Sequence, residues 1–126
     1  MCYNKKEPEL LRVEFYPAGD DGPVREYLRG LKQDPYRKEV ATQLGLDLHL
    51  LQIEGLASRK VDLKRVVGIP GSVWELRRKI EGTQYRIYVC VTRGVIWLLH
   101  HLEKKSRKIP RNDLEIIRKR AKEVLS

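Results

Sequence analysis

The sequence predicts an α+β fold: a small, mainly antiparallel sheet with two N-terminal helices packed on one face and a C-terminal helix. Three observations predict it. Two stretches of helical periodicity follow a short strand-like run, three strand-like runs then come in succession, and a third helical stretch closes the chain. Strands and helices that cluster in separate parts of a chain are typical of this class. With 126 residues, of which 41% are hydrophobic, the chain is long enough for one core, so we expect a single domain over residues 1–126.

The N-terminal part predicts one strand and two helices. Polar and apolar residues alternate over 12–16, which indicates a short strand. Gly22-Pro23 is a helix-start signal, because proline suits the first helical position. A second helix is expected after Asp34-Pro35, with its end at Glu54-Gly55. Apolar residues recur at helical spacing in both: Val24, Tyr27, Leu28 and Leu31, then Val40, Leu44, Leu48 and Leu51.

The central part predicts a loop and then three strands. Residues 56–72 are expected to form a basic loop. Strands are predicted over 73–80 and 84–92, joined by a short glycine-containing hairpin loop. The next strand, 95–102, is apolar almost throughout, which indicates that both its faces are covered over part of its length. The final helix is expected from about Pro110.

The charge of the chain makes a polyanion the first partner to consider. The chain carries 26 Lys and Arg against 17 Asp and Glu, a formal net charge of +9. Residues 104–126 hold nine basic and three acidic residues, and so contribute six of the nine net charges. Such asymmetry favours a specific anion-facing surface over general solubility.

The cysteines and the hydropathy of the sequence exclude several classes of protein. Cys2 and Cys90 do not make a disulfide framework, and no Cys or His spacing of a metal site occurs. We therefore expect no metal and no cofactor. The N-terminus lacks a signal-peptide pattern, and no apolar run approaches the roughly 18 residues of a membrane span. These features predict a cytoplasmic protein without a membrane partner.

Alternation along the strands predicts which side chains share a sheet face. Arg77, Arg86 and Tyr88 point away from the apolar side chains of their strands. Because the two N-terminal helices are expected to cover the apolar face, these three are expected on an uncovered face, near the basic run 104–108. Arg86→Ala would then change stability by only about 0.5 kcal/mol, as at surface positions. Arg78 has the opposite parity and is the expected control. Taken singly, strand arginines are ordinary polar-face residues; together with a tyrosine and a basic run they indicate a phosphate-binding site.

Two histidines end the last strand on opposite predicted faces. His100 shares parity with Leu98, and His101 shares parity with Leu99. Each can be a core or edge histidine. Each also suits proton transfer, since histidine titrates near neutral pH.

Three segments carry a family resemblance: WELR at 74–77, YRIYV at 85–89 and VIWLLHHLEKKSRKIP at 95–110. In order and spacing they resemble the RelE/ParE toxin superfamily, in particular its HigB-like, phage-derived branch. The resemblance implies a RelE-like fold and the toxin of a type II toxin–antitoxin system. Its implied activity is ribosome-dependent mRNA cleavage without a metal, which inhibits translation. Its implied partners are the ribosome, mRNA and a HigA-like antitoxin with a helix-turn-helix domain. Two alternatives stay open: a ParE-like inhibitor of DNA gyrase on the same scaffold, and a non-catalytic nucleic-acid-binding module.

The resemblance also implies roles for individual residues. Arg77 and Arg86 match strand arginines of the family and would clamp the phosphate, since arginine presents a planar fork. A lysine with a lowered pKa, His100 or Tyr88 would be the general base. The catalytic candidates are Arg77, Arg86, Tyr88, His100, Lys104 and Lys105.

Further basic and polar residues are expected to bind RNA. His101 stands where the family usually has glycine. Leu102 stands where it usually has an aromatic residue, which removes a possible surface for base stacking. The RNA-binding candidates are Lys64, Arg65, Lys79, His101, Ser106, Arg107 and Lys108.

Overall fold

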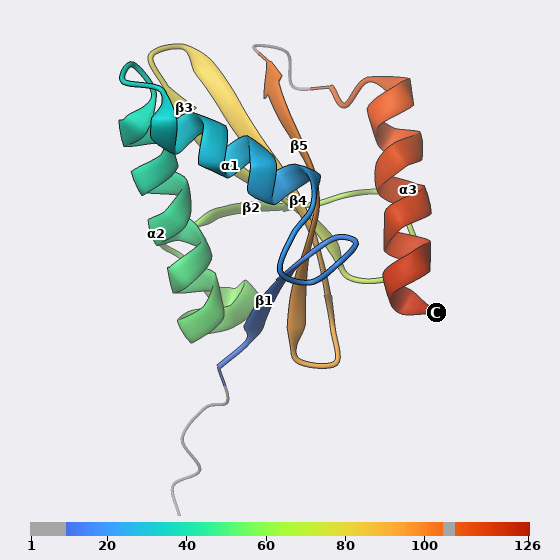
Figure 1. Cartoon of the computed structure of the whole chain (residues 1–126). Helices are drawn as coiled ribbons and strands as arrows, with labels where there is room; N and C mark the ends of the chain where they lie inside the picture. The colour runs from blue at the N-terminus through green and yellow to red at the C-terminus, as the bar shows by residue number, and fades with distance from the viewer. Residues whose placement is uncertain (1–9, 105–107) are drawn as a thin grey trace, which may run out of the picture.

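The structure, a computed structural model, describes residues 10–104 and 108–126, which contain three α-helices, one 3-10 helix and five strands (Figure 1). In chain order these are β1 (Arg12–Phe15), α1 (Pro23–Gln33), α2 (Lys38–Glu54), the 3-10 helix Gly55–Ala57, β2 (Asp62–Arg65), β3 (Val73–Ile80), β4 (Thr83–Thr92), β5 (Val95–Lys104) and α3 (Arg111–Leu125). The second helix begins later than expected, at Lys38, because Asp34 first accepts hydrogen bonds from Tyr36 and Arg37 in a turn. No helix in the described ranges is long and apolar enough to cross a membrane.

The strands of the described residues form one mixed sheet in the order β1-β5-β4-β3-β2. β1 runs parallel to β5, and the other neighbouring strands are antiparallel. The prediction of a loop over 56–72 is wrong at β2, which pairs with Trp74–Arg77 of β3. Only Leu63 is apolar among the four residues of β2, so alternation could not reveal this edge strand.

Helices cover both faces of the sheet. Figure 1 shows α1 and α2 on one side and α3 on the other. A first core, which includes the fully buried Leu44 and Ile87, lies between the sheet and the two N-terminal helices. A second core, which includes the fully buried Leu99 and Ile117, lies between the sheet and α3. The expectation of an uncovered face is therefore wrong over β4 and β5, because the C-terminal helix packs on these two strands.

A β-bulge between β4 and β5 changes the faces of the two histidines. The ladder pairs Tyr88 with His100, but the next residue of β4 with Leu98, so β5 carries one extra residue at Leu99. An extra residue shifts the alternation of the strand beyond it. The predicted parity is thus inverted: His100 contacts α3, and His101 contacts α1.

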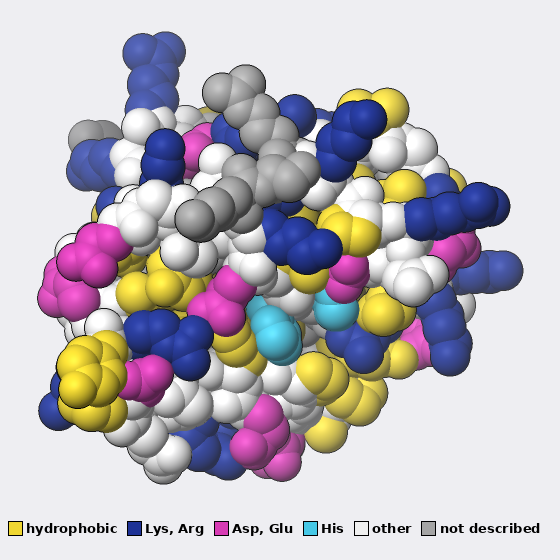
Figure 2. All heavy atoms as spheres, turned by 90° about the horizontal axis from the view of Figure 1, so that it is seen from above, with side chains coloured by type: hydrophobic (Ala, Val, Ile, Leu, Met, Phe, Trp, Pro, Cys, Tyr) yellow, Lys and Arg dark blue, Asp and Glu magenta, His cyan; other side chains and the backbone are white. Residues whose placement is uncertain are grey.

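Positive charge is spread widely over the face of the molecule that Figure 2 shows. Seen from above, Lys and Arg side chains project at several places, and acidic side chains lie between them (Figure 2). Histidine side chains also reach this surface. Net charge alone therefore does not locate a site, and the grouping of particular side chains must do so.

Candidate functional site

The strand register brings the predicted arginines and tyrosine together on the α3 side of the sheet. Arg77 of β3 lies directly opposite Arg86 of β4, and Glu75 lies opposite Tyr88. Residues directly opposite one another in antiparallel strands share a face. The shared face agrees with the alternation of the sequence. Arg78 lies on the other face, where it contacts α2.

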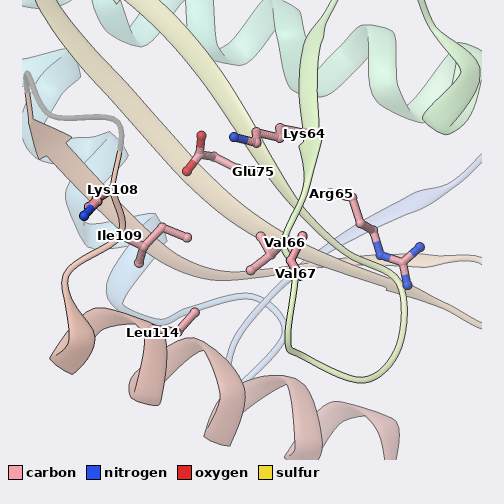
Figure 3. Close-up of a pocket in the computed structure, with 8 residues that line it drawn as sticks. All are labelled: Lys64, Arg65, Val66, Val67, Glu75, Lys108, Ile109 and Leu114. Atoms are coloured by element: carbon pink, nitrogen blue, oxygen red, sulfur yellow. The ribbon is translucent and has the colours of Figure 1, made fainter.

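Two adjoining pockets lie along β2 on the same side. One, of about 410 Å³, is lined by Lys64, Arg65, Val66, Val67, Glu75, Lys108, Ile109 and Leu114 (Figure 3). The other, of about 490 Å³, is lined by Asp62, Lys64, Arg77, Lys79 and Gln84. Lys64 lines both, and we call the two pockets together the basic groove. Its cationic lining residues are Lys64, Arg65, Arg77, Lys79 and Lys108.

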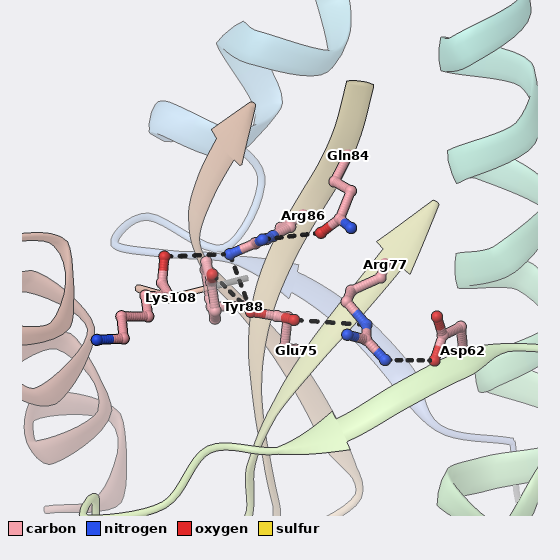
Figure 4. A network of polar contacts seen from close by, with 7 residues as sticks. All are labelled: Asp62, Glu75, Arg77, Gln84, Arg86, Tyr88 and Lys108. Carbon is pink, nitrogen blue, oxygen red and sulfur yellow. Dashed lines mark hydrogen bonds and ion pairs between the residues drawn. The ribbon is translucent and has the colours of Figure 1, made fainter. Parts of the chain in front are cut away.

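The carboxylate of Glu75 is the centre of a polar network beside this groove (Figure 4). The Tyr88 hydroxyl donates a hydrogen bond of 2.7 Å to Oε2 of Glu75, and Nη1 of Arg86 lies 3.8 Å from the same oxygen. Nε of Arg77 lies 3.5 Å from Oε1. Only 4% of Glu75 is exposed, and a carboxylate so buried needs positive groups and donors around it. The network therefore fixes a negative charge between two arginines.

Arg86 is buried, which corrects the expectation of an exposed side chain. It has no exposed surface, and it donates hydrogen bonds to the Gln84 side chain at 2.7 Å and to the backbone carbonyl of Lys108 at 3.5 Å. The reason is that α3 and the segment before it cover this part of the sheet. Arg77 keeps 27% of its side chain exposed. Arg86 can therefore position Glu75, whereas Arg77 reaches the groove.

Tyr88 is a hydrogen-bond donor at neutral pH. Burial raises the pKa of its hydroxyl well above its usual range, and the hydrogen bond to Glu75 raises this pKa further. The neighbouring Arg86 lowers the pKa by less. The phenol is thus protonated when it meets the carboxylate. In this geometry the phenol orients the Glu75 carboxylate through its hydrogen bond.

The two histidines contact different helices. Nε2 of His100 lies 2.8 Å from Oδ1 of Asp113, in the first turn of α3, and the rings of His100 and Tyr88 are 6.3 Å apart. His101 stacks on Tyr27 of α1, with ring centres 3.9 Å apart. Burial lowers the pKa of His101, and the nearby His100 lowers it further. His100 is therefore the histidine on the side of the Glu75 network.

The basic run after β5 is described only in part. Lys104 is exposed and pairs with Gln84 in the ladder, so it belongs to the same side as the groove. Lys108 lines the groove itself. The predicted site residues Lys105, Ser106 and Arg107 lie outside the described residues. Within the described ranges, no group of three or more His, Cys, Asp or Glu side chains could hold a metal ion.

A comparison with protein families finds one family model that matches this chain. The family model described as "Phage derived protein Gp49-like (DUF891)" matches residues 26–122, which is most of the sequence. The chain belongs to this family. The Gp49-like family is a RelE/HigB-like, phage-derived toxin family, so the coarse part of the resemblance in the sequence is confirmed. Comparisons with curated proteins and with solved structures find no significant match.

The region of this Gp49-like protein that matches the family contains every described residue of the network and the groove. Sequence reasoning missed Glu75 as a site residue, although its parity with Arg77 was visible on the strand. Its position opposite Tyr88 depends on the hairpin register, which alternation alone does not give. Asp113 was missed because its contact with His100 exists only once α3 has packed.

Proposed function

We propose that this Gp49-like protein is the toxin of a type II toxin–antitoxin system and acts in the cytoplasm as a ribosome-dependent mRNA endoribonuclease. Membership of a toxin-like family supports the first part. The observation that carries the second is the Glu75 carboxylate, held between two arginines at the edge of a basic groove. Such a site offers a proton acceptor beside cations that can bind a phosphate.

The proposed reaction begins at the ribose 2′-hydroxyl, which only RNA offers. Oε1 of Glu75 takes this proton, since Tyr88 already occupies Oε2. The 2′-oxygen attacks the adjacent phosphorus and forms a cyclic phosphate, and the bond to the 5′-oxygen breaks. His100, oriented by Asp113, gives a proton to the leaving 5′-oxygen.

The cations of the protein stabilise the charge that builds on the phosphate. Arg77 reaches the groove and can bind the phosphate oxygens with both arms of its guanidinium. Lys64 and Lys79 hold the backbone of the message on either side of Arg77. Lys104 and, as the resemblance implies, Lys105 add further charge. With this many fixed cations the proposed mechanism needs no metal.

The proposed partner that neutralises the toxin is a helix-turn-helix antitoxin of the HigA-like kind. This part of the proposal rests on the family alone. A reading frame for such a protein next to that of the toxin would support it, and co-production of the two proteins should abolish toxicity.

Induction of the protein in growing bacteria tests the activity. Translation should stop before DNA replication does, and primer extension should show new 5′ ends within translated codons. Glu75→Gln should lower cleavage on purified ribosomes by about 100-fold or more, because it removes the base and keeps the size of the side chain. Glu103→Gln, at an exposed position on β5, is the matched control and should cleave normally.

Other results would assign other functions. Gyrase-linked DNA breaks with intact transcripts would make the protein a gyrase inhibitor. Binding of RNA without any cleavage, together with full activity of Glu75→Gln, would leave only a nucleic-acid-binding module.

A further inference from the structure

A second groove lies between α1 and α2, on the face of the sheet opposite to the Glu75 network. It measures about 320 Å³ and is lined by Phe15, Arg25, Leu28, Arg29, Lys32, Ala41 and Gly45. Apolar and small residues of β1, α1 and α2 form its floor, and the basic residues of α1 form its rim. Among the described residues that line it, none is acidic.

Gly45 keeps this groove open at a cost in stability. It lies inside α2, where glycine is about 1 kcal/mol less favourable than alanine. A methyl group at this position would meet no neighbouring atom within 4 Å, and the backbone of Gly45 has helical geometry. The fold therefore does not require glycine here. What the missing side chain provides is space above Ala41, four residues earlier on the same side of the helix.

The rim gives the groove a positive charge. Arg25, Arg29 and Lys32 are spaced by four and three residues, so they form one row along α1. The Arg25 guanidinium lies 5.8 Å from the centre of the Phe15 ring, at one end of the floor. Glu26 pairs with Arg29 at 2.5 Å, which leaves a net charge of +2 on these four ionic side chains.

We propose that this groove binds an acidic peptide segment of a protein partner. One large apolar side chain of the segment occupies the space above Gly45, and its carboxylates pair with Arg29 and Lys32. An apolar floor under a basic rim matches such a segment, since phosphates of a nucleic acid would leave the floor unused. The inference does not depend on the proposed nuclease activity, because the groove and the Glu75 network lie on opposite faces of the sheet.

Selection from a random-peptide library displayed on phage tests the proposal. The purified protein is the bait, and Gly45→Leu is used for counter-selection. We expect peptides that combine several acidic residues with one large apolar residue. In calorimetric titrations these peptides should bind Gly45→Leu at least about tenfold more weakly, as when a central apolar anchor is blocked. Thermal stability should not fall, because leucine is a better helix former than glycine.

Gly30→Leu is the matched control. Gly30 lies in α1 with open space around it and does not line the groove, so this variant should bind the selected peptides normally. An excess of 2′-O-methyl RNA should not displace them, and Gly45→Leu should inhibit translation as well as the wild type. Enriched peptides without acidic residues, equal binding to Gly45→Leu, displacement by RNA, or no enrichment at all would each overturn the proposal.

Discussion

The guanidinium of Arg86 has no exposed surface, and one of its nitrogens lies 3.8 Å from the Glu75 carboxylate. We predict that Arg86→Ala lowers the free energy of unfolding by about 3 kcal/mol, because it leaves a buried carboxylate with one cation fewer. Urea denaturation measures this loss. The sequence alone predicted an almost neutral change, so the experiment separates a buried from an exposed arginine.

Lys79→Ala is the control for Arg86. Lys79 is exposed on β3, and its removal should change the free energy of unfolding by no more than about 0.5 kcal/mol. Equal midpoints of urea denaturation for Arg86→Ala and the wild type would mean that Arg86 does not stabilise the Glu75 network.

His101 should make the stability of the fold sensitive to acid. Its pKa is lowered, chiefly by burial, so the unfolded chain binds the proton more readily than the folded one. The stability that results is complete above the unfolded histidine pKa of about 6.5 and is lost as the pH falls below it. We predict that His101→Phe, which keeps a ring against Tyr27, loses less stability between neutral pH and about pH 5. His49→Gln, at an exposed position on α2, is the control, and its stability should depend on pH as that of the wild type does. Identical curves of unfolding free energy against pH for all three proteins would refute the role of His101.

At the scale of single residues, the sequence predicted which side chains lie together better than it predicted which side chains are buried. Strand alternation correctly grouped Arg77, Arg86 and Tyr88, because parity is a local property of a strand. It could not predict that Arg86 is buried, since burial depends on α3, which follows much later in the chain. The roles of these side chains in catalysis remain predictions.

An ion pair between β3 and α2 gives Arg78, the expected control residue, a structural role. Arg78 of β3 binds both carboxylate oxygens of Asp47 on α2, and Asp47 is only 1% exposed. We predict that Arg78→Ala costs about 3 kcal/mol, because Asp47 is left buried without its partner. Replacement of both residues by leucine should cost much less, since it removes the buried charge as well. Thermal unfolding of the single and double variants checks this, and a double variant that is less stable than Arg78→Ala would contradict it.

The elements that the sequence predicted are those with strong local signals. The helix α1 has a clear apolar stripe, α2 is rich in apolar residues over most of its length, and the hairpin of β3 and β4 has a glycine-containing turn. The edge strand β2 was missed because Leu63 is its only apolar residue. The bulge at Leu99 was missed because an extra residue leaves the apolar pattern of β5 unchanged and appears only in the pairing with β4.

For the molecule as a whole, RNA binding should depend on salt through the basic groove. Each phosphate contact contributes about 0.7 to the slope of log affinity against log salt for a single strand. We predict that Lys64→Ala, which removes a cation from both halves of the groove, lowers this slope by about that amount. Fluorescence titration with a 2′-O-methyl oligonucleotide, which cannot be cleaved, measures it. Lys38→Ala on α2 is the control, and an equal change there would place the RNA elsewhere.

The helix α3 follows all five strands in the sequence, and this order matters for folding during synthesis. Because proteins are made from the N-terminus and fold as they emerge, β3, β4 and β5 exist before the helix that covers them. Without that helix Cys90, Leu99 and Leu102 would be exposed to water, whereas they are buried in the folded protein. A chain on which α3 has not yet docked therefore lacks its second core and exposes the apolar residues of that core. A premature stop codon before α3 should leave an aggregating product that spares the cell, even though every strand residue of the site has been translated.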